Sequence, residues 1–194
     1  MIKTGITGII GSGKSIVSSV FQILGIPVYN ADEQAKIIMN TKAKVKTQIV
    51  ENFGQNAYNN NCLNKKHIAS EIFNDKDKRA LMNSIVHPAV EDNFVQWVSK
   101  QKTEICAIES ALIYESGLDE ILDVIIMVAS PQKVLIDRIC KRDSIEASEA
   151  VKRINSQNFY NNTEINPDYY LYNDDEHSII LQSIEIIKKI KEKW

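Results

Sequence analysis

Short apolar segments alternate along the chain with longer segments in which apolar residues recur at helical spacing. Residues 2–7 (IKTGIT), 105–109 (ICAIE) and 124–129 (VIIMVA) are rich in β-branched side chains and nearly free of charge. Runs of this kind are typical of strands buried on both faces of a parallel sheet. Residues 26–30 (IPVYN) and 169–173 (YYLYN) have the length and composition of two further strands. The pattern predicts an α/β fold with a parallel sheet.

The segments between these strands have helical patterns. Residues 14–25 (KSIVSSVFQILG) place apolar side chains on one helix face, and Gly25 marks the end of that helix. Residues 131–160 are charged and helical in pattern, and residues 176–193 predict a closing amphipathic helix. Residues 31–100 are mostly helical in pattern, with a polar, Asn-rich interruption at residues 56–66 that is read as a solvated turn.

One connection is much longer than the others. About seventy residues separate the second strand from the third, several times what a crossover needs. We expect this excess to form a helical insertion beside the strand ends, where an insertion in an α/β enzyme shapes the substrate site.

Composition and charge narrow the class of protein. The chain has 194 residues, 44% apolar and 25% charged, which is ordinary for a globular protein, and its net charge of −2 disfavours a broad nucleic-acid surface. Three distant cysteines form neither a disulfide framework nor a metal-ligand cluster. No signal peptide pattern is visible, and the longest fully apolar run, 124–129, is too short to span a bilayer. We expect a cytoplasmic protein with no membrane and no nucleic-acid partner.

The strongest chemical signal is the sequence GITGIIGSGKS, residues 5–15. Its spacing from Gly8 to Ser15 fits the phosphate-binding pattern GxxxxGK[ST], placed between a predicted strand and a predicted helix. Glycines let the backbone approach phosphates, and the following helix N-terminus favours negative charge. Lys14 supplies a cation for the β and γ phosphates, and Ser15 supplies a hydroxyl for Mg²⁺. A glycine turn without a ligand is the alternative, which this context disfavours.

Three classes of nucleotide-binding protein compete: a small-molecule kinase, a GTPase switch, and a regulatory or DNA-associated ATPase. The chain has no NKxD guanine-binding motif after a late strand. The strand 105–109 ends in Glu109 followed by Ser110 rather than in the Asp-Glu pair that is normal in remodelling ATPases. A kinase fits best, provided that residues suited to an acceptor are present.

Asp32 is a candidate for the general base. It follows the second predicted strand, and if that strand neighbours the first, as short connections favour, Asp32 lies at the carboxyl edge of the sheet near the γ-phosphate. A carboxylate there can orient an acceptor hydroxyl and take its proton. The alternative, a helix N-cap, is equally consistent with the sequence.

Arginines and one histidine are further candidates. Arg138 and Arg142 share a helix face, and Arg153 follows a short break. Arginines on a mobile helical hairpin can neutralise transition-state charge, although a solvated charged face is the simpler interpretation. His87 precedes Pro88, which favours a helix start or kink, and the sequence leaves open whether His87 contacts the acceptor or caps the break.

The ordered set of motifs resembles the dephospho-CoA kinase family. TGIIGSGKS, VYNAD, IVHP, ESALIYESG, SPQKVLIDRICKRD, RINSQ and PDYYLYND occur in that order over nearly the whole chain. The resemblance implies a P-loop kinase with a three-layer α/β/α core of five parallel strands, a helical acceptor subdomain and a lid. It implies a single domain 1–194 with a nucleotide-binding core (1–30 and 104–194), an acceptor subdomain (31–103) and a lid region (131–160).

The family transfers the γ-phosphoryl group of ATP to the ribose 3′-hydroxyl of dephospho-CoA, the last step of coenzyme A synthesis, and uses Mg²⁺. The resemblance implies catalytic roles for Asp32, Lys14 and Arg138, and it implies acceptor-side roles for Asp32, His87, Glu109 and Glu115. It also implies a set of ATP-binding residues, with Ser15 on the metal as well: Gly11, Ser12, Gly13, Lys14, Ser15, Ile16 and Asn173.

The chain departs from the family pattern at several positions. Ile9 replaces a glycine, Ile16 a threonine, Asn30 the first aspartate of DAD, and Glu109–Ala111 replaces D-x-P. Two alternatives therefore stay open: a kinase for another nucleoside or nucleotide, and an inactive nucleotide-binding interaction module. We expect a monomer, with oligomers left open by the sequence.

Overall fold

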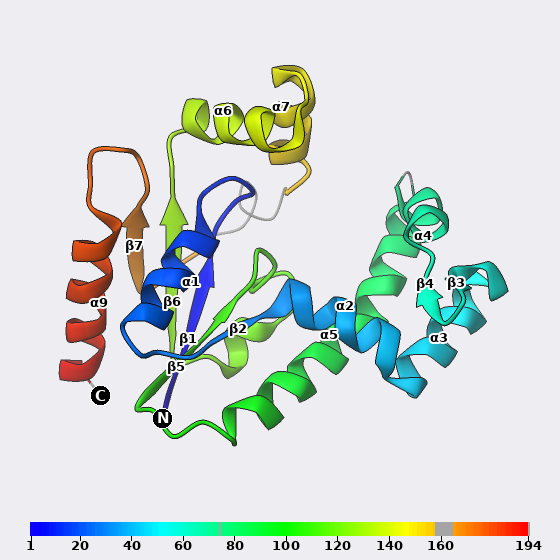
Figure 1. Ribbon diagram of the computed structural model, residues 1–194, viewed down its shortest axis with the longest axis horizontal. Helices are drawn as coiled ribbons and strands as arrows, with labels where there is room; N and C mark the ends of the chain where they lie inside the picture. Colours follow the sequence, from blue (N-terminus) through cyan, green and yellow to red (C-terminus); the bar gives the residue numbers. More distant parts are fainter. Residues whose placement is uncertain (74, 158–164, 194) are drawn as a thin grey trace. The chain divides into compact units, whose positions relative to one another are not determined.

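A computed structural model describes residues 1–73, 75–157 and 165–193 (Figure 1). The chain forms two compact units. The first unit consists of Met1–Tyr29 and Gln101–Trp194, and the second consists of Asn30–Lys100.

The first unit is built on a five-stranded sheet with the order β2-β5-β1-β6-β7. Strand β1 pairs in parallel with β5 and β6, and β6 pairs in parallel with β7. The strands are β1 (Ile2–Thr7), β2 (Val28–Asn30), β5 (Ile105–Glu109), β6 (Val124–Ala129) and β7 (Tyr169–Tyr172). The predicted α/β class with a five-stranded parallel sheet is confirmed.

The expectation that the second strand neighbours the first is wrong, because β2 lies beside β5 at the edge of the sheet. The burial of the strands explains this order. Strands β5 and β6 are buried over almost their whole length and suit the two places beside central β1. In β2 only Tyr29 is fully buried, which suits an edge strand.

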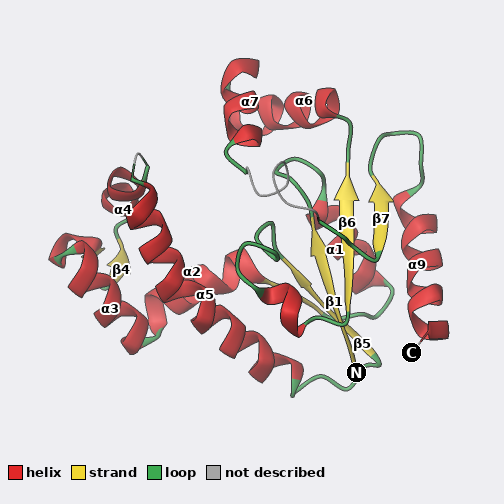
Figure 2. Ribbon diagram, turned by 180° about the vertical axis from the view of Figure 1, so that it is seen from behind, coloured by secondary structure: helices red, strands yellow, loops and turns green. Residues whose placement is uncertain are grey.

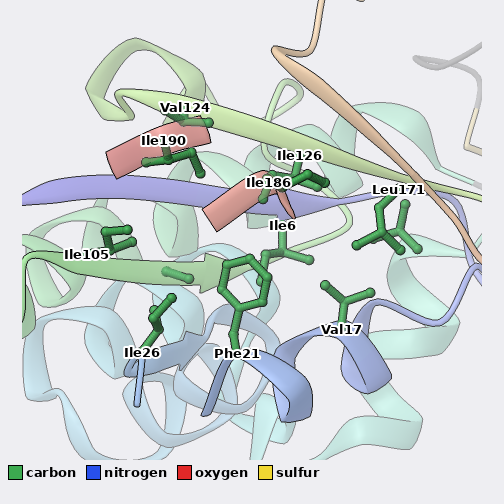
Figure 3. Close-up of a cluster of buried hydrophobic side chains, with 12 residues drawn as sticks. Ile6, Val17, Phe21, Ile26, Ile105, Val124, Ile126, Leu171, Ile186 and Ile190 are labelled. Carbon is green, nitrogen blue, oxygen red and sulfur yellow. The ribbon is translucent and has the colours of Figure 1, made fainter. Parts of the chain in front are cut away.

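Helices α1 (Lys14–Ile23) and α9 (Ile179–Lys193) pack against the sheet and enclose its main core. Figure 3 shows Val17 and Phe21 of α1 and Ile186 and Ile190 of α9 meeting the side chain of Ile6 and its neighbours on the strands. Val17 and Phe21 recur at the helical spacing read from the sequence, and both are completely buried. This packing fixes the start of α1 directly after the glycine-rich loop.

Helices α6 (Gln132–Asp143) and α7 (Ala147–Asn155) form a hairpin that follows the carboxyl end of β6 (Figures 1 and 2). The hairpin has a small core of its own, made of Leu135, Ile139, Ala150 and Ile154. Ser144 ends α6 in the left-handed conformation, which turns the chain toward α7. A short 3₁₀ helix, η2 (Leu118–Ile121), precedes β6.

The second unit is mainly helical. Its elements are α2 (Ala31–Thr41), α3 (Ala43–Phe53), the 3₁₀ helix η1 (Gln55–Ala57), β3 (Tyr58–Asn59), β4 (Cys62–Leu63), α4 (Lys65–Ile72) and α5 (Lys76–Val98). The Asn-rich stretch forms the turn of the β3–β4 hairpin, where Asn60 and Asn61 adopt positive φ. Both asparagines tolerate this left-handed conformation better than most side chains do.

Pro88 lies inside α5 rather than at a helix start. A proline in a helix interior costs about 3 kcal/mol. Apolar residues on both sides of it, Ile85, Val86, Val90 and Phe94, are buried in the second unit. The free energy gained by burying these side chains offsets the cost of Pro88, so the helix continues on both sides of the proline.

The three cysteines differ in their surroundings. Cys106 in β5 is buried, and this burial raises the pKa of its thiol to about 11. Cys140 is half-buried against the core of the α6–α7 hairpin, whereas Cys62 in β4 is exposed.

Among the helices that the structure describes, none combines the length and the apolar character that a membrane span requires.

Candidate active site

The loop between β1 and α1 has a backbone that only glycine permits at two positions. Gly8 has φ +148° and Gly13 has φ +94°. A Cβ at Gly8 would overlap the carbonyl oxygen of Val128, and a Cβ at Gly13 would overlap the amide of Asn173. Because the loop runs directly into α1, the positive end of the dipole of that helix lies at the loop. This arrangement can hold an anion.

Lys14 and Ser15 occupy the first positions of α1. The Lys14 ammonium donates hydrogen bonds to the carbonyl oxygens of Gly8 at 2.8 Å and Ile9 at 3.3 Å. Ser15 and Ile16 are exposed, whereas Ser12 is buried. The structure therefore places the cation of Lys14 on the loop itself and leaves the hydroxyl-bearing Ser15 accessible beside it.

Asn173, the first residue after β7, connects the loop to Arg138 through its side-chain amide. Its Nδ2 donates to the Ser12 carbonyl oxygen at 2.8 Å, and its Oδ1 accepts from Arg138 at 3.0 Å. Asn173 is only 5% exposed. Its amide is engaged by protein groups on both sides.

Arg138 of α6 donates to groups at the ends of β6 and β7. Its guanidinium reaches Ser130 Oγ at 3.3 Å, the Asn173 carbonyl oxygen at 3.2 Å and Asp175 Oδ1 at 3.3 Å. Ser130 in turn donates to the carbonyl oxygens of Asn173 and Ser12. The structure thus brings Arg138 together with Asn173 and the glycine-rich loop.

Arg142 and Arg153 meet on one carboxylate. Arg142 donates to both oxygens of Asp143, at 2.8 and 3.0 Å, and Arg153 donates to Asp143 Oδ2 at 2.6 Å. The hydrogen bond from Arg142 holds the pKa of Asp143 below its usual range. Arg153 also lies 3.7 Å from Glu149. Arg153 of α7 therefore joins that helix to Asp143 at the end of α6, whereas Arg142 pairs with Asp143 within α6.

A cavity of about 560 Å³ lies beside the start of α1. Ile16, Val20, Ile179 and Ile180 give it an apolar side, and Asn173 with residues 175–178 gives it a polar side. Beside this polar side, hydrogen bonds from the backbone N–H and the ring of His177, and from the backbone N–H of Glu176, lower the pKa of Asp174 to about 2. An apolar wall with a polar rim suits a flat heteroaromatic ring with polar edges.

Glu109 and Glu115 also belong to the first unit. Glu109 is the last residue of β5, and Glu115 lies in the turn that precedes η2. The Glu115 side chain is exposed, yet neighbouring protein atoms desolvate its carboxyl group and raise its pKa. Ser110 accepts the N–H of Leu112 at 3.0 Å, which orders this turn without the proline of the family pattern.

Asp32 lies in the first turn of α2 and is exposed. The N-cap of this helix is Asn30, whose side chain accepts the N–H of Glu33 at 2.9 Å. The interpretation of Asp32 as the N-cap is therefore wrong, because Asn30 fills that place. This cap also explains what the asparagine does at a position where the family pattern has an aspartate.

His87 is half-buried in α5 within the second unit, and this burial lowers its pKa.

The lowered pKa of His87 predicts a pH-dependent stability, because the unfolded chain binds a proton near pH 6.5 more readily than the folded chain does. We expect the free energy of unfolding to decrease as the pH falls from 7 through this ordinary value. His87→Gln should flatten that slope in denaturant titrations at pH 7.0, 6.0 and 5.5. An unchanged slope would contradict the assignment.

One loop contact had no signal in the sequence. Gln157 accepts the backbone N–H of Ile10 at 2.7 Å, from a position just beyond α7. The segment RINSQ contributes to the family resemblance, but no spacing rule connects its glutamine to the glycine-rich loop. Ser130 and Asp143 were missed for the same reason, since their partners are set by the tertiary fold.

Comparison with known proteins identifies relatives over the whole chain. The family model for dephospho-CoA kinase matches residues 2–178. A dephospho-CoA kinase from Porphyromonas gingivalis is 35% identical over 194 residues, which cover 100% of this chain and 96% of the relative.

Two solved structures share the fold. A crystal structure from Thermus thermophilus has a TM-score of 0.79 at 24% identity, covering 99% of this chain and 97% of the other. A dephospho-CoA kinase from Campylobacter jejuni has a TM-score of 0.69 at 22% identity, covering 98% of each chain.

Proposed function

Because the chain belongs to the dephospho-CoA kinase family, we propose that it phosphorylates the ribose 3′-hydroxyl of dephospho-CoA with ATP, yielding CoA and ADP. The observation that carries this proposal is the similarity over the full chain together with an intact phosphate-binding loop. Lys14 and Ser15 stand at their expected places at the start of α1. The departures from the family pattern leave these groups in place.

ATP binds with its phosphates on the loop of residues 8–15 and its base in the cavity beside α1. The loop N–H groups and Lys14 hold the β and γ phosphates, for which Lys14 leaves the carbonyl oxygens that it now contacts. Ile16 and Ile179 supply the apolar wall for the base. Asn173 holds the loop backbone through its hydrogen bond to the Ser12 carbonyl oxygen.

Mg²⁺ fits this site through Ser15. This ion usually takes few protein ligands and keeps waters and substrate phosphates, so one exposed hydroxyl at the helix start suffices. No group of three His, Cys, Asp or Glu side chains suited to a metal occurs in residues 1–73, 75–157 and 165–193. When bound with ATP, Mg²⁺ neutralises charge on the β and γ phosphates.

Asp32 acts as the general base on the ribose 3′-hydroxyl. It follows β2 in the chain and is exposed, and the N-cap function that would otherwise account for it belongs to Asn30. His87, Glu109 and Glu115 serve the acceptor. In this proposal residues 31–103 form the acceptor subdomain, residues 131–160 form the lid, and the protein acts as a monomer.

Arg138 acts from the α6–α7 hairpin. Its hydrogen bonds to Asn173 and Asp175 hold it beside the segment that rims the base cavity. From there the guanidinium closes over bound ATP and offsets the charge that develops on the transferred phosphoryl group.

The test is ADP release with ATP and Mg²⁺ in the presence and absence of dephospho-CoA, with the product mass checked for one added phosphate. Release that depends on dephospho-CoA, with CoA formed, supports the proposal. Release that depends on a different nucleoside or nucleotide in a panel of acceptors would point to another kinase activity. ATP binding without any product would indicate an inactive nucleotide-binding module.

A further inference from the structure

Gln157 connects the far end of the α6–α7 hairpin to the tip of the phosphate-binding loop. Its Oε1 accepts the Ile10 N–H at 2.7 Å, and its own backbone N–H donates to the Ile154 carbonyl oxygen at 3.1 Å. The side chain is half-buried. Gln157 therefore links the backbone N–H of Ile10 to the last turn of α7, although Ile10 and Gln157 are 147 positions apart in the sequence.

The tip of the loop also packs against the hairpin. Ile9 and Ile10 contact the small core that α6 and α7 form around Leu135 and Ile139. A Cβ added to Gly11 would come within 3.1 Å of Ile139, so the loop backbone lies close against α6. The hydrogen bond to Gln157 thus adds a directional contact between the loop and the hairpin, which already pack together through apolar side chains.

The opposite side of the loop is held by a different part of the fold. Asn173 and Ser130 donate to the Ser12 carbonyl oxygen, at 2.8 and 3.1 Å. The loop is therefore fixed from the sheet at Ser12 and from the hairpin at Ile10. Among the contacts of the described residues, apolar packing would still hold the tip against the hairpin if the bond at Ile10 were lost, but such packing is not directional.

The chemistry of the side chain suits a place beside phosphates. A neutral amide accepts the Ile10 N–H without adding charge. A carboxylate would accept the same hydrogen bond but would repel the phosphate groups of a nucleotide on the loop. Glutamine provides the acceptor at no electrostatic cost to nucleotide binding.

We propose that Gln157 is a positioning residue that holds the Ile10 amide and so keeps the phosphate-binding loop in register with the hairpin that carries Arg138. The inference rests on the proposed kinase function for its effect on turnover. Its effects on the Ile10 amide and on ATP binding do not depend on the acceptor.

The test compares Gln157→Met, which keeps the length but loses the acceptor, with Gln157→Glu, which keeps an acceptor but adds charge. We expect Gln157→Met to speed hydrogen exchange of the Ile10 amide about tenfold and raise the Kd of MgATP about fivefold, as expected for one net hydrogen bond. The value of kcat/KM should fall by at least the same factor. Gln157→Glu should keep the Ile10 amide protected while still raising the Kd.

Gln182→Met is the matched control, because Gln182 Oε1 accepts the Tyr172 N–H at 2.9 Å in the same kind of bond away from the loop. It should leave the Ile10 exchange rate unchanged. Unchanged Ile10 exchange in Gln157→Met, or faster exchange with a wild-type or tighter Kd, overturns the proposal. If Gln157→Met does not fold, loss of Ile10 protection in Gln157→Glu overturns it instead. Absence of CoA formation by the wild type would refute the proposed function and leave the exchange and Kd results valid.

Discussion

Asp32→Asn is expected to lower kcat by about a hundredfold to ten-thousandfold, the range in which a general base contributes. The substitution keeps the size of the side chain and removes the group that we propose takes the proton of the ribose hydroxyl. The Kd of MgATP should stay nearly unchanged, because the phosphates are held by the loop and Lys14. The measurement is steady-state CoA formation at saturating ATP and dephospho-CoA, combined with calorimetric titration of MgATP.

Glu33→Gln is the control for this experiment. Glu33 is the next residue in the same first turn of α2, so its replacement removes an equal charge from the same end of the helix dipole. It should retain nearly full turnover. Near-normal turnover of Asp32→Asn would instead show that the base is another group, and Glu109 at the end of β5 would be the first alternative to replace.

Lys14→Ala is expected to reduce kcat/KM by about a hundredfold to a thousandfold, as removal of one preorganised donor does in other enzymes. Unlike Asp32→Asn, it should also weaken MgATP binding, because in the proposed mechanism the ammonium contacts the phosphates in the ground state and in the transition state alike. Turnover and the MgATP Kd measured on the same preparation separate these two patterns.

Lys188→Ala removes an exposed cation from α9 and serves as the control for net charge. It should leave both quantities unchanged. A Lys14→Ala variant with normal affinity and reduced turnover would restrict the role of Lys14 to the transition state. A variant with normal values of both would refute the assignment of Lys14.

Local patterns predicted most of the fold. The strands at residues 105–109 and 124–129 match β5 and β6 to the residue, because a short apolar run between polar turns has few alternatives. The order of the strands was not predictable in the same way. Chain connectivity favoured β2 beside β1, but β5, which is buried over almost its whole length, occupies that place instead.

The candidate site likewise contains residues that a local pattern predicts and residues that only the tertiary fold brings together. The loop from Gly8 to Ser15 is contiguous, so its spacing alone indicates its chemistry. Asn30 has the signature of an N-cap, since it precedes a helix and Glu33 follows it three residues later, but Asp32, which follows the predicted strand, was an equally good candidate for the cap. The partners of Arg138 and Gln157 come from distant segments, and no local rule relates such positions before the chain is folded.

The surroundings of the three thiols have a practical consequence for labelling. Maleimide reagents react with the thiolate. Burial keeps Cys106 away from such reagents and also raises the pKa of its thiol, so that the thiol stays protonated. Exposed Cys62, in the β3–β4 hairpin of the second unit, should therefore take up a fluorophore first. Substoichiometric dye on the unaltered chain would give a probe within residues 30–100, and its anisotropy on adding dephospho-CoA would report how that unit responds to the acceptor.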